Sequence, residues 1–137
     1  MTAPLLLIAD DDADMRSLVR TTLAREYPEA LELTDGRELF WHLMRASFAN
    51  ARQPRDHIMI VDIRMPGYTG LEVLDAWHGE GDAVPCIVIT SFPDDAVRDK
   101  VARLDATLVA KPFTRRALLE AVRETARRVR RRKEHKK

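Results

Sequence analysis

The sequence predicts an α/β protein with a doubly wound, five-stranded parallel sheet and helices on both of its faces. Two observations carry this prediction. Short, continuous apolar runs, which are typical of strands buried on both faces of a sheet, alternate along the chain with segments of helical periodicity. This alternation occurs about five times, as it does when parallel strands are joined by helical crossovers. The length of 137 residues, of which 45% are hydrophobic and 33% charged, indicates one globular domain.

Five segments are expected to form the strands of this sheet. Four are continuous apolar runs, and the second alternates apolar and charged residues, as a half-exposed edge strand does. In order they are residues 5–9, 31–33, 58–61, 86–89 and 108–110. Cys86, the single cysteine, begins the fourth run. It is expected to be an inert buried residue, and an internal disulfide is excluded.

Residues spaced as on one face of a helix predict the connecting helices. The first such stripe contains Met15, Leu18, Val19, Thr22 and Leu23. The later stripes contain Phe40, Leu43, Met44 and Phe48, then Leu71 and Leu74, then Val97, Val101 and Leu104, and finally Leu118, Val122 and Thr125. Trp41 and Trp77 are expected to be packing residues, Trp41 at a helix edge. Residues 50–55, which include a proline, are expected to form a surface loop.

Several polar residues indicate where helices begin. Pro93 is expected to open the fourth helix, with Asp94 and Asp95 in its first turn. Thr114 can cap the last helix. Asp12 is expected to favour the start of the first helix rather than to bind a metal, because an acidic residue there complements the helix dipole.

The net charge of +1 is divided unevenly along the chain. Residues 127–137 contain eight of the 23 Lys and Arg but one of the 22 Asp and Glu, so this segment carries +7 and residues 1–126 carry −6. Residues 1–126 are therefore expected to form the domain, followed by a basic helix end or tail. Such a run is most often a solvated helix end. Nucleic acid is not expected as a partner beyond nonspecific phosphate contacts of this tail.

The composition also bears on location. No apolar run approaches the roughly 18 residues that a membrane helix needs, and residues 5–9 are too short for the core of a signal peptide. A single cysteine favours a reducing compartment. The protein is therefore expected to be cytoplasmic and to have no membrane contact.

Polar side chains follow the expected strands at the points where they end. Three aspartates, residues 10–12, follow the first strand, Asp62 ends the third, Thr90 the fourth, and Lys111 follows the fifth. In a doubly wound sheet these residues converge on the edge where ligands bind. Crowded carboxylates repel one another, unless a hard cation such as Mg²⁺ lies among them. An acidic Mg²⁺ pocket with an ammonium and a hydroxyl nearby suits phosphoryl transfer.

The same stretches resemble the receiver domain of two-component response regulators over nearly all of residues 3–126. The matching stretches are LLLIADDD (residues 5–12), IVDIRMPG (60–67), GLEVL (70–74), VITS (88–91) and KPF (111–113). Their order, spacing and placement at strand ends are specific as a set. The resemblance implies the flavodoxin-like strand order 2-1-3-4-5.

The resemblance also implies a role for each site residue. Asp62 is implied as the phosphoacceptor for a sensor histidine kinase or phosphotransfer protein. Asp10, Asp11 and Asp62, with the backbone carbonyl of Arg64, are implied as the Mg²⁺ site, Asp10 partly through water. Lys111 is implied to pair with the phosphoryl group.

The same resemblance implies how the protein signals. Thr90 is implied as the hydroxyl that moves onto a phosphoryl oxygen. The protein is then expected not to be an enzyme beyond Mg²⁺-dependent self-phosphorylation and self-dephosphorylation. Its phosphorylation state is expected to act on an effector protein or on a phosphorylation-dependent homodimer.

Three other interpretations stay open. The chain can be a receiver fragment of a longer regulator or hybrid kinase. A flavodoxin-like mononucleotide carrier shares the fold but needs a phosphate-binding loop where residues 10–12 are acidic. A Mg²⁺-dependent phosphohydrolase of the haloacid dehalogenase type needs a second aspartate at position 64, which is Arg64.

The sequence departs from the receiver pattern at two places. Leu108 stands three residues before the lysine, where many receivers have an aromatic residue that swings inward. Leu104, Asp105 and Ala106 stand where Gly-Ala is common. Neither change touches the phosphorylation chemistry, but both bear on how a signal leaves the site. Lys111 precedes Pro112, which makes this bond a candidate cis peptide.

Overall fold

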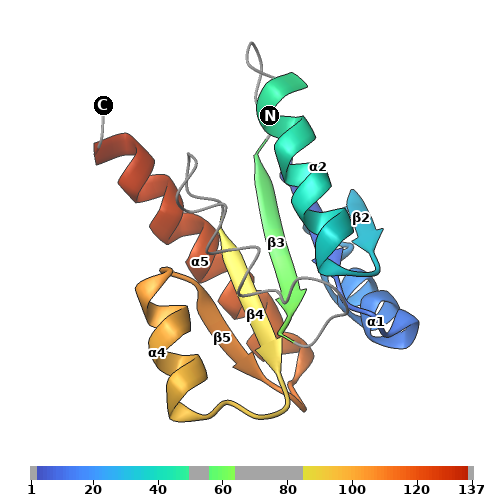
Figure 1. The fold of residues 1–137 in the computed structure, drawn as a ribbon, viewed down its shortest axis with the longest axis vertical. Coiled ribbons are helices and arrows are strands. Elements are labelled where there is room, and N and C mark those ends of the chain that lie inside the picture. Colours follow the sequence, from blue (N-terminus) through green and yellow to red (C-terminus); the bar gives the residue numbers. More distant parts are fainter. Residues whose placement is uncertain (1–2, 50–55, 64–84, 136–137) are drawn as a thin grey trace.

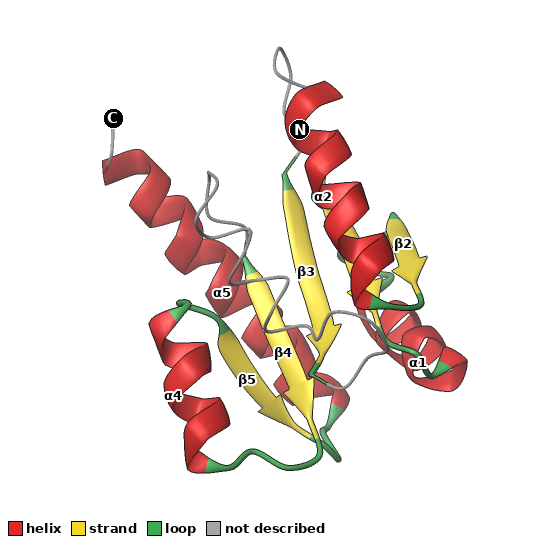
Figure 2. Cartoon of the chain, viewed as in Figure 1, coloured by secondary structure: helices red, strands yellow, loops and turns green. Residues whose placement is uncertain are grey.

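The computed structural model describes residues 3–49, 56–63 and 85–135, with side chains up to residue 44 in the first range and 128 in the last. Its five strands form one parallel sheet in the order β2-β1-β3-β4-β5, which confirms the predicted fold class and order. The strands are β1 (Leu5–Ala9), β2 (Ala30–Leu33), β3 (His57–Asp62), β4 (Cys86–Thr90) and β5 (Thr107–Ala110). The helices are α1 (Ala13–Leu23), α2 (Gly36–Ala49), α4 (Asp95–Arg103) and α5 (Arg115–His135). They lie on both faces of the sheet (Figures 1 and 2).

Each face of the sheet carries its own apolar core. On one face, α2 and α4 pack through Leu39, Leu43 and Val101 against alternate strand residues such as Leu7 and Val88. On the other face, α1 and α5 cover the strand residues that point the opposite way. The buried residues of this second core include Leu6, Ile8, Val19, Leu23, Ile60, Ile87, Leu118 and Val122. Successive residues of a strand point to opposite faces, so a strand between two helical layers must be apolar throughout. This is why continuous apolar runs predicted the strands.

Cys86 lies at the buried start of β4, as expected. Burial raises the pKa of its thiol to about 12. The reactive thiolate is therefore scarce in the folded protein at neutral pH.

Two apolar side chains expected to pack are instead exposed. Leu18 is 48% exposed and Trp41 is 63% exposed. A helix has 3.6 residues per turn, so Trp41, two positions from each of the buried residues Leu39 and Leu43, lies on the far side of α2. In α1 the buried residues are Val19 and Leu23, and the stripe is too narrow to include Leu18.

The expected helix starts are mostly found, with one correction at α4. This helix begins at Asp95, and Asp94 is its N-cap, accepting from the amide of Val97. Pro93 therefore precedes the helix instead of opening it, and Asp94 is not in its first turn. Thr114 caps α5, because its Oγ1 accepts from the amide of Ala117 at 3.0 Å. The predictions for residues 50–55, Leu71, Leu74 and Trp77 lie outside the described residues, as does the side chain of Phe48.

Helix α5 is the longest of the described helices, with 21 residues. Leu118, Val122 and Thr125 form its fully buried stripe, as predicted. The helix continues as far as His135, so most of the basic segment 127–137 is helical. In the described part of the chain, no helix has both the length and the apolar character needed to cross a membrane.

Candidate functional site

Three carboxylates meet at the carboxyl ends of β1 and β3. Ala9 is paired with Val61 across these strands, so Asp10, Asp11 and Asp62 leave the sheet at the same level. One carboxylate oxygen of each lies within 4.8 Å of the other two. Asp10 is buried, Asp62 half-buried and Asp11 exposed. The cluster is therefore open to solvent on the Asp11 side.

Asp10 is the most constrained of the three. It is 4% exposed, and its Oδ1 accepts from the backbone amide of Asp12 at 2.9 Å. Burial raises the pKa of Asp10 to about 6; Asp62 and Asp11 add to the rise, and the Asp12 amide and Lys111 oppose it. A buried carboxylate among like charges favours a cation beside it.

Lys111 supplies one positive charge to this cluster. Its Nζ lies 3.4 Å from Oδ2 of Asp62 and 3.8 Å from Oδ2 of Asp10. The backbone amide of Lys111 donates to the carbonyl of Thr90 at 2.8 Å, which ties the end of β5 to that of β4. The bond from Lys111 to Pro112 is cis, as expected.

Thr90 lies at the end of β4, on the strand next to the one that carries Asp62. The side chain is buried, with 3% of the residue exposed. Its Oγ1 accepts from the amide of Phe92 at 3.1 Å. Phe92 itself is 62% exposed. The hydroxyl thus holds the first turn of the loop that leads to α4.

Asp12, the third aspartate of the run, does not belong to the carboxylate cluster and has a structural role. It is the N-cap of α1, and its Oδ1 accepts from the amides of Asp14 at 2.9 Å and Met15 at 3.4 Å. This agrees with the expected helix-start role. Arg64, the expected backbone ligand, lies outside the described residues.

One contact of the site was not expected from the sequence. Arg16 Nη1 donates to the backbone carbonyl of Asp10 at 2.8 Å, while its Nε donates to Glu32 at 3.2 Å. It therefore fixes the main chain at the point where the acidic run leaves β1. No motif predicts this contact, because it depends on how α1 turns back over the sheet.

The three carboxylates are a donor set that fits Mg²⁺. This ion takes oxygen ligands, commonly one or two carboxylates together with water and phosphate oxygens. The described cluster offers three carboxylate groups and includes no nitrogen or sulfur donor. Such a set favours a hard cation over a transition metal.

Comparison with known proteins identifies the family. Residues 6–123 match the model of the response regulator receiver domain. The chain belongs to this family. Receiver domains bind Mg²⁺ through an acidic pocket of this kind, and response regulators interact with histidine kinases and effector proteins. A receiver domain is a phosphoacceptor module of two-component signalling rather than an enzyme of the classical kind.

Two of the curated relatives are bacterial transcriptional regulatory proteins. The receiver is 35% identical over 122 residues to the transcriptional regulatory protein FixJ of Azorhizobium caulinodans, covering 88% of this chain and 53% of the relative. It is 33% identical over 121 residues to the C4-dicarboxylate transport regulator DctD of Pseudomonas aeruginosa, covering 86% and 24%. The chain thus spans between a quarter and about half of these two relatives.

Solved structures agree on the fold. The chemotaxis protein CheY4 of Vibrio cholerae is 26% identical, with a TM-score of 0.73 and coverage of 90% of this chain and 99% of that one. The receiver domain of a LuxO repressor protein from Vibrio parahaemolyticus has a TM-score of 0.83 at 17% identity, with 99% of both chains covered. The second likeness supports the fold alone.

Proposed function

We propose that Asp62 is the phosphoacceptor of this receiver. A carboxylate oxygen of Asp62 attacks the phosphorus of a phosphohistidine on a sensor histidine kinase or phosphotransfer protein. The new O–P bond makes an acyl phosphate, the P–N bond breaks, and the imidazole leaves with the electron pair. The observation that carries the proposal is the contact of 3.4 Å between Lys111 Nζ and Asp62 Oδ2, beside two further carboxylates.

Charge decides what this site requires. An incoming phosphoryl group is negative, and three carboxylates repel it, while Lys111 offers one compensating charge. Asp10, Asp11 and Asp62, together with the backbone carbonyl of Arg64, would hold Mg²⁺. When bound, this ion supplies the charge neutralisation on which phosphoryl transfer depends.

Thr90 would couple phosphorylation of Asp62 to a change of conformation elsewhere in the molecule. In the structure its Oγ1 accepts from the Phe92 amide, and the hydroxyl keeps a proton to donate. A phosphoryl oxygen on Asp62, on the neighbouring strand, is a strong acceptor for that proton. Movement of Thr90 toward it would draw the loop before α4 inward. We assign α4 as the element whose position changes with phosphorylation.

The remaining expectations belong to the same proposal. Residues 1–126 act as the phosphoacceptor unit, followed by a basic helix end or tail over residues 127–137. Turnover is limited to Mg²⁺-dependent self-phosphorylation and self-dephosphorylation, in the cytoplasm. The output is binding of an effector protein or a phosphorylation-dependent homodimer, within this chain or within a longer regulator or hybrid kinase of which it is a part. The family match favours this function over a mononucleotide carrier or a phosphohydrolase.

The test is the loss of the acceptor oxygen in Asp62→Asn. With Mg²⁺ and acetyl phosphate, the wild-type protein should gain one acid-labile phosphoryl group, measured by intact mass. The Asn variant should gain none, because an amide is a poor nucleophile. Asp12→Asn is the matched control: it removes one carboxylate from the same acidic run, yet should still be labelled. Equal labelling of Asp62→Asn and wild type would show that the acceptor is another residue.

A further inference from the structure

The end of α5 farthest from the acidic site concentrates positive charge. Helix α5 starts near the carboxyl ends of the strands and runs back along the sheet, so its last turns rise beyond the starts of β4 and β5 (Figure 1). Six of the seven residues 127–133 are Arg or Lys. The carboxylate cluster therefore lies at the carboxyl ends of the strands, and the basic end of α5 lies at the opposite side, where β4 and β5 begin.

The helix is anchored where the basic segment begins. Arg128 Nη2 donates to the carbonyl of Asp105 at 3.1 Å and to Oγ1 of Thr107 at 3.0 Å. Its Nε lies 3.3 Å from Oδ1 of Asp105. These contacts fix the start of the basic segment to β5 and to the turn between α4 and β5. The basic residues beyond Arg128 therefore extend from a held helix rather than from a free chain end.

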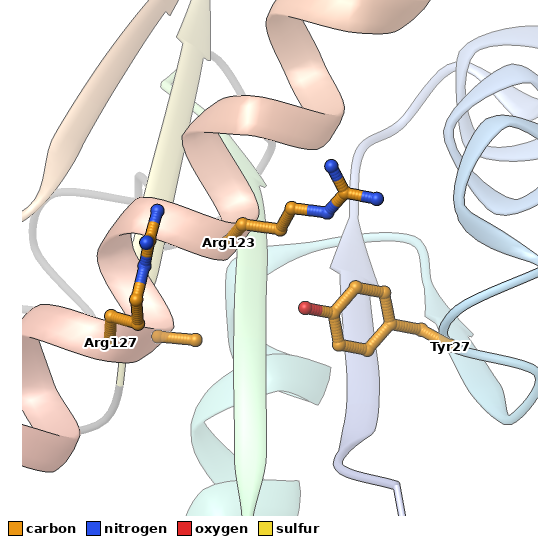
Figure 3. Close-up of a pocket in the computed structure, with 4 residues that line it drawn as sticks. Tyr27, Arg123 and Arg127 are labelled. Atoms are coloured by element: carbon orange, nitrogen blue, oxygen red, sulfur yellow. The ribbon is translucent and has the colours of Figure 1, made fainter.

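A recess lies beside the same helix, where this segment begins. It has a volume of about 400 Å³ and is lined by Tyr27, Arg123, Ala126 and Arg127. Figure 3 shows the Tyr27 ring facing α5, with Arg123 and Arg127 on successive turns of that helix. Arg123 pairs with Glu26. Arg127 makes an exposed contact of 3.3 Å with Glu124, which an incoming anion can replace at little cost.

We infer that this end of α5, from Arg127 to Lys133, binds the phosphate backbone of double-stranded nucleic acid without reading its base sequence. Arginine binds phosphate in a bidentate way, and five of the eight basic residues of the segment are Arg. A duplex carries its charges at regular, close spacing. The recess beside Arg127 gives one phosphate a place next to the helix. The acidic remainder of the molecule would repel the same duplex, so contact is limited to this end.

The composition of the segment argues against two other anionic partners. A helix that enters a membrane surface needs an apolar face, and residues 127–137 contain a single apolar residue, Val129. Stable protein interfaces are depleted of charge at their centre and rely on aromatic or apolar anchors. With 3.6 residues per turn, the basic positions from 127 to 133 lie on all sides of the helix. This arrangement suits a charged polymer that is contacted at its backbone.

The test is binding of the full chain to a fluorescent 20-base-pair DNA duplex of random sequence, followed by anisotropy at several salt concentrations. If about four basic residues reach phosphates, the slope of log K against log salt is about −3.6, and affinity falls roughly 100-fold between 50 and 200 mM salt. Duplexes of different sequence should bind equally. Arg130→Gln combined with Arg131→Gln should weaken binding and reduce the slope by up to about two.

A matched variant separates local contacts from net charge. Arg115→Gln combined with Arg116→Gln removes the same two charges from the first turn of the same helix, and both residues are exposed. It should bind DNA as the wild type does. Equal weakening of the two double variants, or no binding at 50 mM salt, would overturn the inference. So would displacement of the duplex by polyglutamate at equal charge, which indicates an acidic protein, or preferential capture by phosphatidylserine vesicles.

Discussion

Asp105 has a left-handed backbone conformation, with a φ of 57°. This conformation costs a residue with a Cβ about 1 kcal/mol or more, although Asp tolerates it better than most residues. Glycine has no such penalty, and the sequence departs here from the glycine common in receivers. The structure gives a reason for the departure. The Asp105 carboxylate and carbonyl both contact Arg128, so the side chain offsets part of the backbone strain by holding α5.

Substitutions at Asp105 should separate backbone strain from the ion pair. Asp105→Ala loses the pair and keeps the strain, whereas Asp105→Gly loses the pair and removes the strain. We expect the Ala variant to be less stable than the Gly variant by about 1 kcal/mol, measured by urea unfolding. Ala102→Gly, at an exposed position in α4, is the control. Here the protein with Gly should be less stable than the protein with Ala, because Gly destabilises a helix. Equal stability of the two Asp105 variants would contradict the strain argument.

Helix α4 is the element best placed to change with phosphorylation. It has nine residues, and its one fully buried side chain is Val101. It is joined to β4 by a short loop whose first turn depends on the Thr90 hydroxyl. Leu108, on the adjacent β5, is half-buried against the same core. It cannot act as an aromatic switch, so we expect the loop to carry most of the coupling.

Thr90→Ala should uncouple α4 from the site. A hydrogen bond to a charged group contributes about 1.5–3 kcal/mol, so its loss should shift the equilibrium between the two positions of α4 by about tenfold or more. Phosphorylation of Asp62 should remain largely intact. The measurement is the change in amide hydrogen exchange of α4 on adding beryllofluoride, a phosphoryl mimic.

Leu108→Ala is the comparison for this experiment. It removes a partly buried side chain and lowers stability, but it should keep the response of α4 to beryllofluoride. A normal response in Thr90→Ala together with a lost response in Leu108→Ala would place the coupling in β5. That outcome would contradict the assignment of the loop.

The elements also explain what the sequence could predict. The strands were predictable because both faces of each central strand are covered, which demands apolar residues at every position. Their ends were extended to His57 and Thr90 by pairing with neighbours, which no local pattern records. Leu18 and Trp41 were misplaced because apolar spacing does not define how wide the covered stripe of a helix is. Helix α5 continues after its apolar periodicity has ended, because arginine favours a helix. The apolar pattern therefore could not predict its full length.

The meeting of the site residues was predictable for a different reason. In a parallel sheet the carboxyl ends share one edge, so Asp62 and Lys111 had to meet beside the aspartates after β1 once the strands were known. The contact of Arg16 with Asp10 was not predictable, because it depends on the packing angle of α1. Arg128 and Asp105 are 23 residues apart and meet across two elements, and neither matches a motif.

On the scale of the whole molecule, the proposed metal site can form only when the fold brings β1 and β3 together. The unfolded chain separates Asp62 from Asp10 and Asp11 by about 50 residues of sequence, so Mg²⁺ should bind the folded state alone. A ligand with this preference stabilises the fold according to its concentration relative to its Kd. Mg²⁺ should therefore raise the thermal midpoint of unfolding. The size of this rise measures Mg²⁺ binding to the unphosphorylated protein.

At a Mg²⁺ concentration of about ten times Kd, the expected gain is about 1.4 kcal/mol, or about 5 °C in Tm for a domain of this size. Asp11→Ala should lose most of this gain while changing the metal-free Tm little, because Asp11 is exposed. Asp12→Ala should do the reverse: it lowers the metal-free Tm by removing the N-cap of α1, worth about 1 kcal/mol, yet keeps the gain. Sodium chloride of equal ionic strength controls for screening. A lost gain in Asp12→Ala with a normal gain in Asp11→Ala would move the metal ligand one residue along the acidic run.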